Sequence, residues 1–462
     1  MKKRGSSTVV ISLGSLVSFF LLILYFSNST LNSNIKFSTI SQESMHMPEK
    51  STGRENLRSV LPSLQSPKAT QIECNRSHYS YDICKINSPT VLDPTTSTFY
   101  VMSPKSPSLE EKIRPYARKW EPFTMSRIKA ITLTSGPLSP KCQVQHKAPA
   151  LVFSAGGYTG NFFHDFNDGF IPLYITVNSI FNKQDPILVI SEANNWWINK
   201  YAEILRGFSQ HQIINLDNNN VTHCFPSVDV GLISHGFMTI NPKSIPNAKT
   251  FTHFHAFLRK AYTRSHHVQI AKTSKSPASR PRLVLVCRTG ATGRVLMNRD
   301  QVKEEAEKIG FDVVVFEPTA KTPLSVAYDL VSSSHVMVGV HGAGLTHALF
   351  LRPGSVLVQV VPLGAEWVAE VCFGNPARAA RLEYMEYRIK AEESSLIEKY
   401  GKDEMVVKDP VAFRGNKWSA EVMHVYLKKQ DIRVDLNRFS GYLKEAYKKS
   451  NKLLENGEKS SG

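Results

Sequence analysis

The chain has 462 residues, of which 42% are hydrophobic and 21% charged, which is enough length and apolar content for two sizeable globular cores. Its formal net charge of +17 indicates either an anionic partner, such as a sugar nucleotide, an acidic polysaccharide or a membrane surface, or basic residues spread without such a role. No basic run is interleaved with aromatic residues, which argues against nucleic-acid binding.

The N-terminus predicts a membrane anchor. Residues 9–26 form an uncharged apolar run that is long enough to cross a bilayer as a short helix. Basic residues before it favour a cytoplasmic tail at residues 1–8 and a lumenal remainder, with a cleaved signal peptide as the alternative. Residues 27–70 are rich in Ser, Asn and Thr and lack an apolar period, so they predict a disordered stem.

A lumenal location predicts glycosylation and disulfide bonds. Asn75 and Asn220 lie in Asn-x-Ser/Thr sequons and are expected to be glycosylated. Among the six cysteines, Cys74 and Cys84 are the first candidates for a disulfide, because they are close together in a polar segment. Cys287 ends an apolar run, which favours a buried free thiol.

Metal ligation is not expected. The sequence has no Cys-x-x-Cys, no His-x-x-x-His beside a carboxylate and no Asp-x-Asp pair. Zinc sites rely on spacings of the first two kinds, and many sites that hold a divalent ion against a diphosphate rely on the third. The sequence therefore predicts that a bound phosphate is neutralised by side chains and helix ends.

Residues 71–265 are interpreted as an N-terminal α/β domain. From residue 150 onward, apolar strand-like runs alternate with helical segments, which predicts a parallel sheet covered by helices. Strands are expected at residues 151–153, 186–190 and 228–233, and helices at 161–175 and 196–208. Pro172 falls inside the first of these helices, and the pattern does not explain it. A basic, Ser-rich segment near residues 264–280 is the expected linker.

Residues 280–462 are interpreted as a second, doubly wound α/β domain. Strands are expected at residues 283–287, 313–316, 336–340 and 356–361. Helices are expected from residue 298 or 300 to 309, and at 323–333 and 345–351. In sheets of this kind, ligands bind beyond the carboxyl ends of the strands.

The loop after the first of these strands carries groups suited to a diphosphate. Arg288 and Arg294 flank a glycine-bearing turn, and their guanidinium groups are expected to neutralise phosphate. Asn298 is expected to cap the next helix or to touch the ligand. Glu317, at the end of the neighbouring strand, is a candidate for a ribose hydroxyl. The alternative is that these are solvated loop residues without a ligand.

A second turn, after the strand at 336–340, is glycine-rich. The backbone N–H groups that open the following helix are expected to bind phosphate, while a histidine donates to it and a threonine assists. The alternative is that the glycines only permit close packing of strand and helix. The residues concerned are His341, Gly342, Ala343, Gly344, Leu345 and Thr346.

A third group of polar residues lies in the N-terminal half. On a helix, the spacing of Asn161, His164 and Asp168 places them on one face, as in a lined cleft. A transferase needs a general base for the acceptor hydroxyl, and Asp168 is the first candidate and His164 the second. The alternative is that the two only bond each other. His235 and Trp367 are further candidates for the acceptor cleft.

These motifs together resemble glycosyltransferase family 61. The resemblance rests on Arg288, Arg294 and Asn298, on the His341 segment and on the Asn161, His164 and Asp168 spacing. The segment between residues 366 and 387 is similar to the plant xylan pentosyltransferases of that family. The resemblance implies a GT-B fold, with two Rossmann-like domains facing a cleft. It also implies a Golgi type II membrane protein that inverts configuration, uses a UDP-sugar donor and requires no metal or other cofactor.

The resemblance also implies roles for individual residues. The Arg288, Arg294 and His341 segments would contact UDP, and Asp168 or His164 would lie at the acceptor. Gln359 stands where members acting on protein O-glycans often carry a glutamate, which favours the xylan branch. The expected reaction adds a pentose to xylan, either xylose as a β-1,2 branch or arabinofuranose as an α-1,3 branch. The alternatives are transfer to an N-glycan core or protein O-glycan, and a non-catalytic protein that binds polysaccharide or belongs to a Golgi transferase complex.

Overall fold

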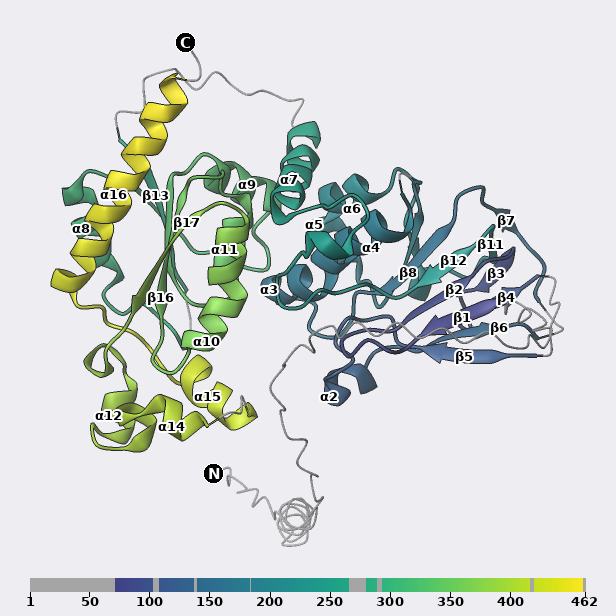
Figure 1. Ribbon diagram of the computed structural model, residues 1–462, viewed down its shortest axis with the longest axis horizontal. Helices are drawn as coiled ribbons and strands as arrows, with labels where there is room; N and C mark the ends of the chain where they lie inside the picture. Colours follow the sequence, from purple (N-terminus) through teal and green to yellow (C-terminus); the bar gives the residue numbers. More distant parts are fainter. Residues whose placement is uncertain are drawn as a thin grey trace, which may run out of the picture. The chain divides into compact units, whose positions relative to one another are not determined.

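Figure 1 shows the computed structural model, which describes residues 71–102, 108–136, 139–182, 184–265, 280–288, 293–415 and 419–459. The predicted tail, anchor and stem at residues 1–70 lie outside these ranges, as does most of the predicted linker. Within them, no helix is both long enough and apolar enough to span a membrane. The described ranges belong to one compact unit that begins at Lys68.

The C-terminal half is built on a five-stranded parallel sheet in the order β14-β13-β15-β16-β17. Its strands are β13 Arg282–Val286, β14 Asp312–Phe316, β15 Val336–Val340, β16 Val356–Val361 and β17 Glu383–Arg388. The first four confirm the predicted strands. The fifth has partly exposed, charged residues and no continuous apolar run, so the sequence did not reveal it. The order reverses between β13 and β15, as in doubly wound folds.

Helices cover both faces of this sheet (Figure 1). Alternate residues of β13 point to opposite faces: Leu283 and Leu285 pack with α8 and α16, whereas Val284 and Val286 pack with α9 and η4. Both faces are therefore buried, which explains the near-continuous apolar strands. The helices of this half are α8 Arg299–Ile309, α9 Leu324–Ser332, η4 Ala343–Phe350, α10 Glu366–Ala369, η5 Glu370–Gly374, α11 Asn375–Ala379, η6 Ala391–Glu393, α12 Leu396–Tyr400, α13 Met405–Lys408, α14 Pro410–Arg414, α15 Ala420–Lys428 and α16 Leu436–Lys459.

The N-terminal half contains two sheets, and so the expectation of a simple Rossmann-like domain is corrected. One sheet has the order β1-β2-β12-β8-β9-β10, in which β12, β8, β9 and β10 are parallel, while β2 pairs antiparallel with both β12 and β1. Its strands are β1 Ile72–Asn75, β2 Ile83–Ile86, β8 Ala150–Ser154, β9 Ile187–Ser191, β10 Ile214–Asn215 and β12 Val228–Val230.

The second sheet, in the order β5-β6-β4-β3-β11-β7, packs against the first. Its strands are β3 Thr90–Asp93, β4 Thr98–Val101, β5 Glu110–Ile113, β6 Ile131–Thr134, β7 Val144–Gln145 and β11 His223–Phe225. Most of its pairs are antiparallel, and its inward side chains, such as Leu92, Phe99 and Leu133, are fully buried. Strands this short give too little alternation to be recognised from sequence.

The predicted helix at 161–175 is a run of three helical segments. It consists of α3 Phe162–His164, the π-helix η1 Asp165–Phe170 and α4 Ile171–Ile180. Pro172 stands in the first turn of α4, where a missing N–H is tolerated after the wide π turn. The other helices of this half are α2 Pro122–Ser126, α5 Asn195–Lys200, α6 Ala202–Phe208, η2 Leu216–Asn218, η3 Pro242–Ser244 and α7 Phe251–Ser265.

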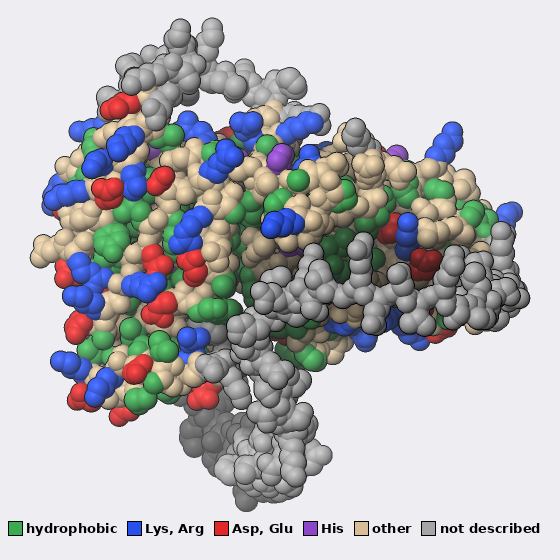
Figure 2. All heavy atoms as spheres, in the orientation of Figure 1, with side chains coloured by type: hydrophobic (Ala, Val, Ile, Leu, Met, Phe, Trp, Pro, Cys, Tyr) green, Lys and Arg blue, Asp and Glu red, His purple; other side chains and the backbone are tan. Residues whose placement is uncertain are grey.

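One apolar core joins the two halves. Phe166 and Phe254 from the N-terminal half belong to the same buried cluster as Leu345, Phe350 and Phe373 from the C-terminal half. On the surface, Figure 2 shows basic and acidic side chains intermixed where α8 and α16 lie, so the excess positive charge is not gathered into one patch on that face. Asn75 and Asn220 are exposed, as N-glycosylation would require.

Two disulfides link cysteines of the N-terminal half. The predicted Cys74–Cys84 bond is confirmed, and Cys142 pairs with Cys224. Cys287 is a buried free thiol, as expected, and Cys372 is a second one. The Cys142–Cys224 bond ties β11 to the segment that leads into β7, within the second sheet.

Loss of the longer disulfide loop is expected to destabilise the protein more than loss of the shorter one. The bonds close loops of 82 and 10 residues. By the chain-entropy relation, Cys142→Ser lowers the free energy of unfolding by about 4 kcal/mol and Cys74→Ser by about 3 kcal/mol. Urea unfolding of the two variants beside the parent measures both values. A larger loss in Cys74→Ser would contradict the loop-length argument.

Candidate active site

A pocket of about 540 Å³ lies where the strand order of the C-terminal sheet reverses. The chain leaves β13 and β15 towards opposite sides of the sheet, which opens a crevice at their carboxyl ends. Both halves of the protein line it, the N-terminal half through the residues that begin α3. Its lining consists of Gly160, Asn161, Phe162, Lys200, Val286, Cys287, Arg288, Arg294, Leu296, Pro318, Thr319, Ala320, Thr322, Leu324, Val340, Ala343, Gly344 and His347.

Two arginines converge on the glycine-rich turn in this pocket. A Cβ atom on Gly342 would lie 2.3 Å from Nη2 of Arg288 and 3.2 Å from Nη1 of Arg294, so only glycine permits this approach. Nη1 of Arg294 donates to the carbonyl of His341 over 3.2 Å. Arg294 also holds a left-handed backbone conformation with φ of 62°, an unfavourable state that is found preferentially at functional sites.

The electrostatics of the pocket favour an anion. Burial lowers the pKa of both Arg288 and Arg294, and that of Arg294 falls to about 9 because Arg288 adds like-charge repulsion. No carboxylate occurs in the described lining of the pocket. Nε of Arg294 is buried without a hydrogen-bond partner among the described residues. Two partly buried cations in such surroundings gain charge-assisted hydrogen bonds when a phosphate enters.

Fewer residues of the glycine-rich turn line the pocket than the sequence predicted. Ala343 and Gly344 line the pocket. The N–H of Leu345 donates to the carbonyl of Gly342 over 2.9 Å, and its side chain is fully buried in the core. Thr346 is buried beside a separate apolar cavity, and its hydroxyl has no partner among the described residues. The pocket lining therefore excludes Leu345 and Thr346, and it also excludes His341 and Gly342, which lie against the two arginines.

His341 is held in one protonation state by its neighbours. Its pKa falls to about 3, first because of burial and then because of the charges of Arg294 and Arg288. Nδ1 lies 2.8 Å from the amide nitrogen of Gln359, whose oxygen accepts the hydroxyl of Tyr384 over 2.7 Å. The amide therefore donates to Nδ1, which places the single imidazole proton of neutral His341 on Nε2.

His347 and Lys200 are pocket residues that the sequence analysis missed. His347 stacks on Phe162 at 4.2 Å, and burial lowers its pKa to about 4. Its Nδ1 lies 2.8 Å from the carbonyl of Gly344, an arrangement that braces the turn. Nζ of Lys200 donates to the carbonyl of Ala320 over 3.3 Å, and burial lowers its pKa. The one sequence feature that could have pointed to His347 is its position six residues after His341.

Asn298 and Glu317 are engaged elsewhere. The side-chain amide of Asn298 donates to the Val434 carbonyl over 2.9 Å and accepts the Val434 N–H over 3.1 Å. Asn298 precedes α8 but makes no side-chain cap, so the expectation of capping is corrected. The carboxylate of Glu317 pairs with Arg299 over 2.7 Å. Neither residue belongs to the pocket lining.

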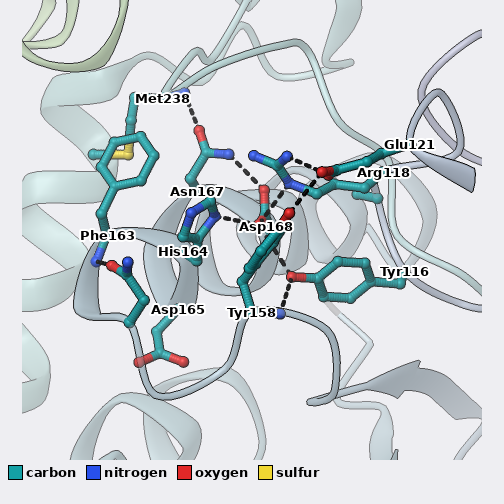
Figure 3. Close-up of polar contacts among 12 residues, drawn as sticks. Tyr116, Arg118, Glu121, Tyr158, Phe163, His164, Asp165, Asn167, Asp168 and Met238 are labelled. Atoms are coloured by element: carbon teal, nitrogen blue, oxygen red, sulfur yellow. Dashed lines mark hydrogen bonds and ion pairs between the residues drawn. The ribbon is translucent and has the colours of Figure 1, made fainter. Parts of the chain in front are cut away.

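Asp168 is the centre of a buried polar cluster on the π-helix η1, shown in Figure 3. Its Oδ2 accepts from Tyr116 Oη at 3.0 Å, from Arg118 Nε at 2.9 Å and from His164 Nδ1 at 2.8 Å. Its Oδ1 accepts from the Asn167 amide at 2.5 Å. The side chain is 2% exposed.

These partners control the charge of Asp168. Burial alone would raise its pKa, but the hydrogen bond from His164 and the charge of Arg118 outweigh that effect, and the pKa is lowered. The carboxylate therefore stays ionised, and both of its oxygens are engaged in hydrogen bonds. His164 is more accessible, with 18% of its side chain exposed, and its ring stacks on Tyr158 at 4.4 Å. The bond through Nδ1 leaves Nε2 as the ring nitrogen for other chemistry.

Residues far away in the sequence complete this cluster. Arg118 is 5% exposed and pairs with Glu121 over 2.7 Å as well as with Asp168. Tyr158 donates to Glu121 over 2.6 Å. None of these was a candidate from the sequence, because they lie in irregular segments without a recognisable spacing. The only signal was an arginine among aromatic residues between 116 and 120.

The three residues predicted for the acceptor lie in different surroundings. Asn161 caps α3 by accepting the N–H of Phe163 over 3.1 Å and lines the pocket. His235 is partly buried, and its Nδ1 accepts the N–H of Asn241 over 3.0 Å. Trp367 is 47% exposed on α10, and its ring lies 6.4 Å from that of Phe237.

A crevice with two arginines at the switch point of a doubly wound sheet, next to a buried His–Asp pair, is an arrangement suited to group transfer from a nucleotide-linked donor. Comparison with known proteins defines the class. Residues 160–358 match the Glycosyltransferase 61 family. The chain is 40% identical to a xylan glycosyltransferase from Arabidopsis thaliana, over 84% of this chain and 82% of that protein.

Two relatives from Oryza sativa subsp. japonica carry specific names. An alpha-1,3-arabinosyltransferase is 34% identical over 81% of this chain and 64% of that protein. A beta-1,2-xylosyltransferase is 33% identical over 85% of this chain and 87% of that protein. The chain therefore belongs to the glycosyltransferase 61 family, and it is a glycosyltransferase. The resemblance seen in the sequence is confirmed.

The pKa of His341 is expected to depend on the residue at 359. Gln359→Glu places a carboxylate beside Nδ1, which stabilises the imidazolium and raises the pKa of His341 above its value of about 3. Tyr384→Phe, the control, removes the hydroxyl that orients Gln359 without adding charge, and the pKa stays low. Histidine NMR titration measures both, with the resonance assigned through His341→Gln.

The same substitution has a consequence for acid stability. The unfolded chain binds a proton at this histidine near pH 6.5, whereas the folded protein does so only near 3. The contribution of neutral His341 is therefore complete above pH 6.5 and is lost as the pH falls towards 3. A raised pKa in Gln359→Glu makes that loss smaller. An unchanged NMR titration in this variant would contradict the proposed contact.

Proposed function

We propose that this protein transfers a pentose from a UDP-sugar to the xylan backbone. The observation that carries the proposal is the identity of 33–40% over most of the chain with relatives named as xylan, xylosyl- and arabinosyltransferases. The proposal includes xylose as a β-1,2 branch and arabinofuranose as an α-1,3 branch, because relatives of both kinds are similar to the chain at nearly equal levels. It also includes a GT-B arrangement, a Golgi location and a type II anchor at residues 9–26.

In this proposal the donor diphosphate lies between Arg288, Arg294 and the turn at Gly342. Their depressed pKa values support it, because an anion relieves the cost of holding two neighbouring cations in a partly buried pocket. His341 offers an Nε2 proton as a neutral donor to the leaving group. The two guanidiniums neutralise the charge that UDP gains as it leaves, the role that a divalent ion has in other transferases.

His164 is the proposed general base, with Asp168 as the residue that positions it. The acceptor hydroxyl oxygen attacks the anomeric carbon, the bond from that carbon to the UDP phosphate oxygen breaks, and the hydroxyl proton passes to Nε2 of His164. Asp168 was the first candidate from the sequence, but its four hydrogen bonds and low pKa make it a poor proton acceptor. Attack opposite to the leaving group inverts the configuration.

A product assay tests the reaction itself. The full-length protein is incubated with xylohexaose and either UDP-xylose or UDP-arabinofuranose, with EDTA present, and the products are identified by mass spectrometry and linkage analysis. We expect pentose addition from one donor under EDTA. Products that form only on an N-glycan or glycopeptide acceptor would replace xylan in the proposal, and turnover that requires a divalent ion would overturn the role given to the arginines.

His164→Gln is expected to lower kcat by about 10²–10⁴-fold, because the base is lost. The affinity for UDP, measured by calorimetry, should stay within about twofold of the parent value, since His164 is not part of the donor pocket lining. A kcat close to that of the parent would show that another group accepts the proton.

Gly342→Ala is expected to weaken UDP binding by about tenfold or more, because the new methyl group would lie 2.3 Å from Nη2 of Arg288. Gly441→Ala is the matched control. That glycine lies in α16 and has no atom within 4 Å of a built Cβ, so the substitution should leave UDP affinity unchanged. Calorimetric titration with UDP compares the two variants. Equal affinities would mean that Arg288 does not need this approach to bind the diphosphate.

A further inference from the structure

Three aromatic rings from different segments lie next to one another on the surface near Asp168. The ring of Phe237 is 6.0 Å from that of Trp120 and 6.4 Å from that of Trp367. Trp120 and Trp367 are 46% and 47% exposed, which is unusual for the largest apolar side chain. Trp120 precedes α2, Phe237 follows β12, and Trp367 lies on α10. We refer to these three residues as the aromatic platform.

Two rings of the platform, Trp120 and Phe237, pack against a buried cation. The guanidinium carbon of Arg118 lies 4.9 Å from the Trp120 ring and 5.8 Å from the Phe237 ring, within the range of cation–π contacts. Arg118 is itself almost fully buried and is held by ion pairs with Asp168 and Glu121. One side chain therefore positions the platform relative to the carboxylate that holds His164.

The platform is also close to the proposed base through a second ring. Tyr158 lies 5.0 Å from the guanidinium carbon of Arg118 and stacks on His164 at 4.4 Å. Its hydroxyl is held by Glu121, which is also the partner of Arg118. Arg118 and Tyr158 therefore connect the platform to the imidazole that, in the proposed mechanism, accepts the proton of the acceptor hydroxyl.

We propose that Trp120 and Trp367 form an acceptor subsite that binds the xylan backbone by stacking against the faces of its sugar rings, with Phe237 edge-on between them at interplanar angles of 64° and 85°. This inference rests on the proposed function. Pyranose rings carry C–H groups on their faces and hydroxyl groups at their edges. A flat, exposed indole can therefore pack against the C–H groups while the hydroxyl groups stay in water. A xylose unit has no exocyclic hydroxymethyl group, which allows the rings to approach closely.

The subsite has a structural consequence. Trp120 and Phe237 belong to the N-terminal half, whereas Trp367 belongs to the C-terminal half that carries the arginine pocket. The acceptor chain therefore contacts both halves, and the subsite is complete only while they are packed together. Substitutions here act on acceptor binding and leave the donor pocket and the His164–Asp168 bond unchanged.

The test measures acceptor kinetics and donor binding separately in the full-length protein. Trp120→Ala and Trp367→Ala are each expected to raise KM for xylohexaose by about tenfold, with kcat changed by less than about threefold. Calorimetric affinity for UDP and the melting temperature should match those of the parent. Trp120→Phe and Trp367→Phe, which keep a flat ring, should restore most of the affinity for xylohexaose.

Phe413→Ala is the control, because Phe413 is 39% exposed on α14, its ring lies 6.1 Å from that of Tyr426, and it is not one of the three rings of the platform. It should keep the KM of the parent. Parent-like KM values in both tryptophan variants would overturn the subsite while leaving xylan transfer standing. A loss of UDP affinity or of melting temperature in these variants would assign the rings a structural role instead. A parent protein that neither binds nor extends xylohexaose would overturn the proposed function together with the subsite.

Discussion

The carboxylate of Asp168 organises the proposed acceptor side of this protein. It is almost inaccessible to water and accepts four hydrogen bonds, from Tyr116, Arg118, His164 and Asn167. A buried charge is tolerated only when its partners replace the lost hydration, so each of these donors has a fixed place. The π-helix η1 carries Asp168, and the Asn167 amide oxygen in turn accepts the N–H of Met238. One ionised group thus positions a histidine, an arginine and the segment that follows β12.

The proposed donor side has a different electrostatic arrangement. Arg288 and Arg294 meet at Gly342 with no carboxylate in the described pocket lining, and their charges add to the effect of burial in depressing the pKa of His341. The acceptor side is neutralised internally, whereas the donor side gains most when an anion enters. In the proposed mechanism, the donor diphosphate therefore meets the wall with the two arginines, and the acceptor meets the wall whose charges are already paired.

A shared core keeps the two walls together. Phe163 from the N-terminal half and Phe373 from η5 lie 5.7 Å apart, and His341 contacts Phe373 at 5.3 Å. Cys372, beside Phe373, is close enough to Arg118 and Asp168 for both charges to affect the pKa of its buried thiol, which burial raises to about 12. The small, neutral thiol therefore lies where the C-terminal half approaches the acceptor-side cluster.

The sequence by itself determined the parallel strands of the C-terminal half, because β13, β15 and β16 are buried on both faces and read as apolar runs. It also determined which turns carry Arg288, Arg294 and His341, and the helical spacing that joins His164 to Asp168, since these are local features. Other features could not be predicted because they form only with partners elsewhere in the chain. These features are the short strands of the second N-terminal sheet, β17, and the side-chain contacts of Asn298 and Glu317. Arg118 is the clearest example, because it lies 50 positions from Asp168. Only the tertiary structure decided that Asp168 is fully paired and His164 accessible, because burial and hydrogen bonding to distant residues set the charge and reach of a side chain.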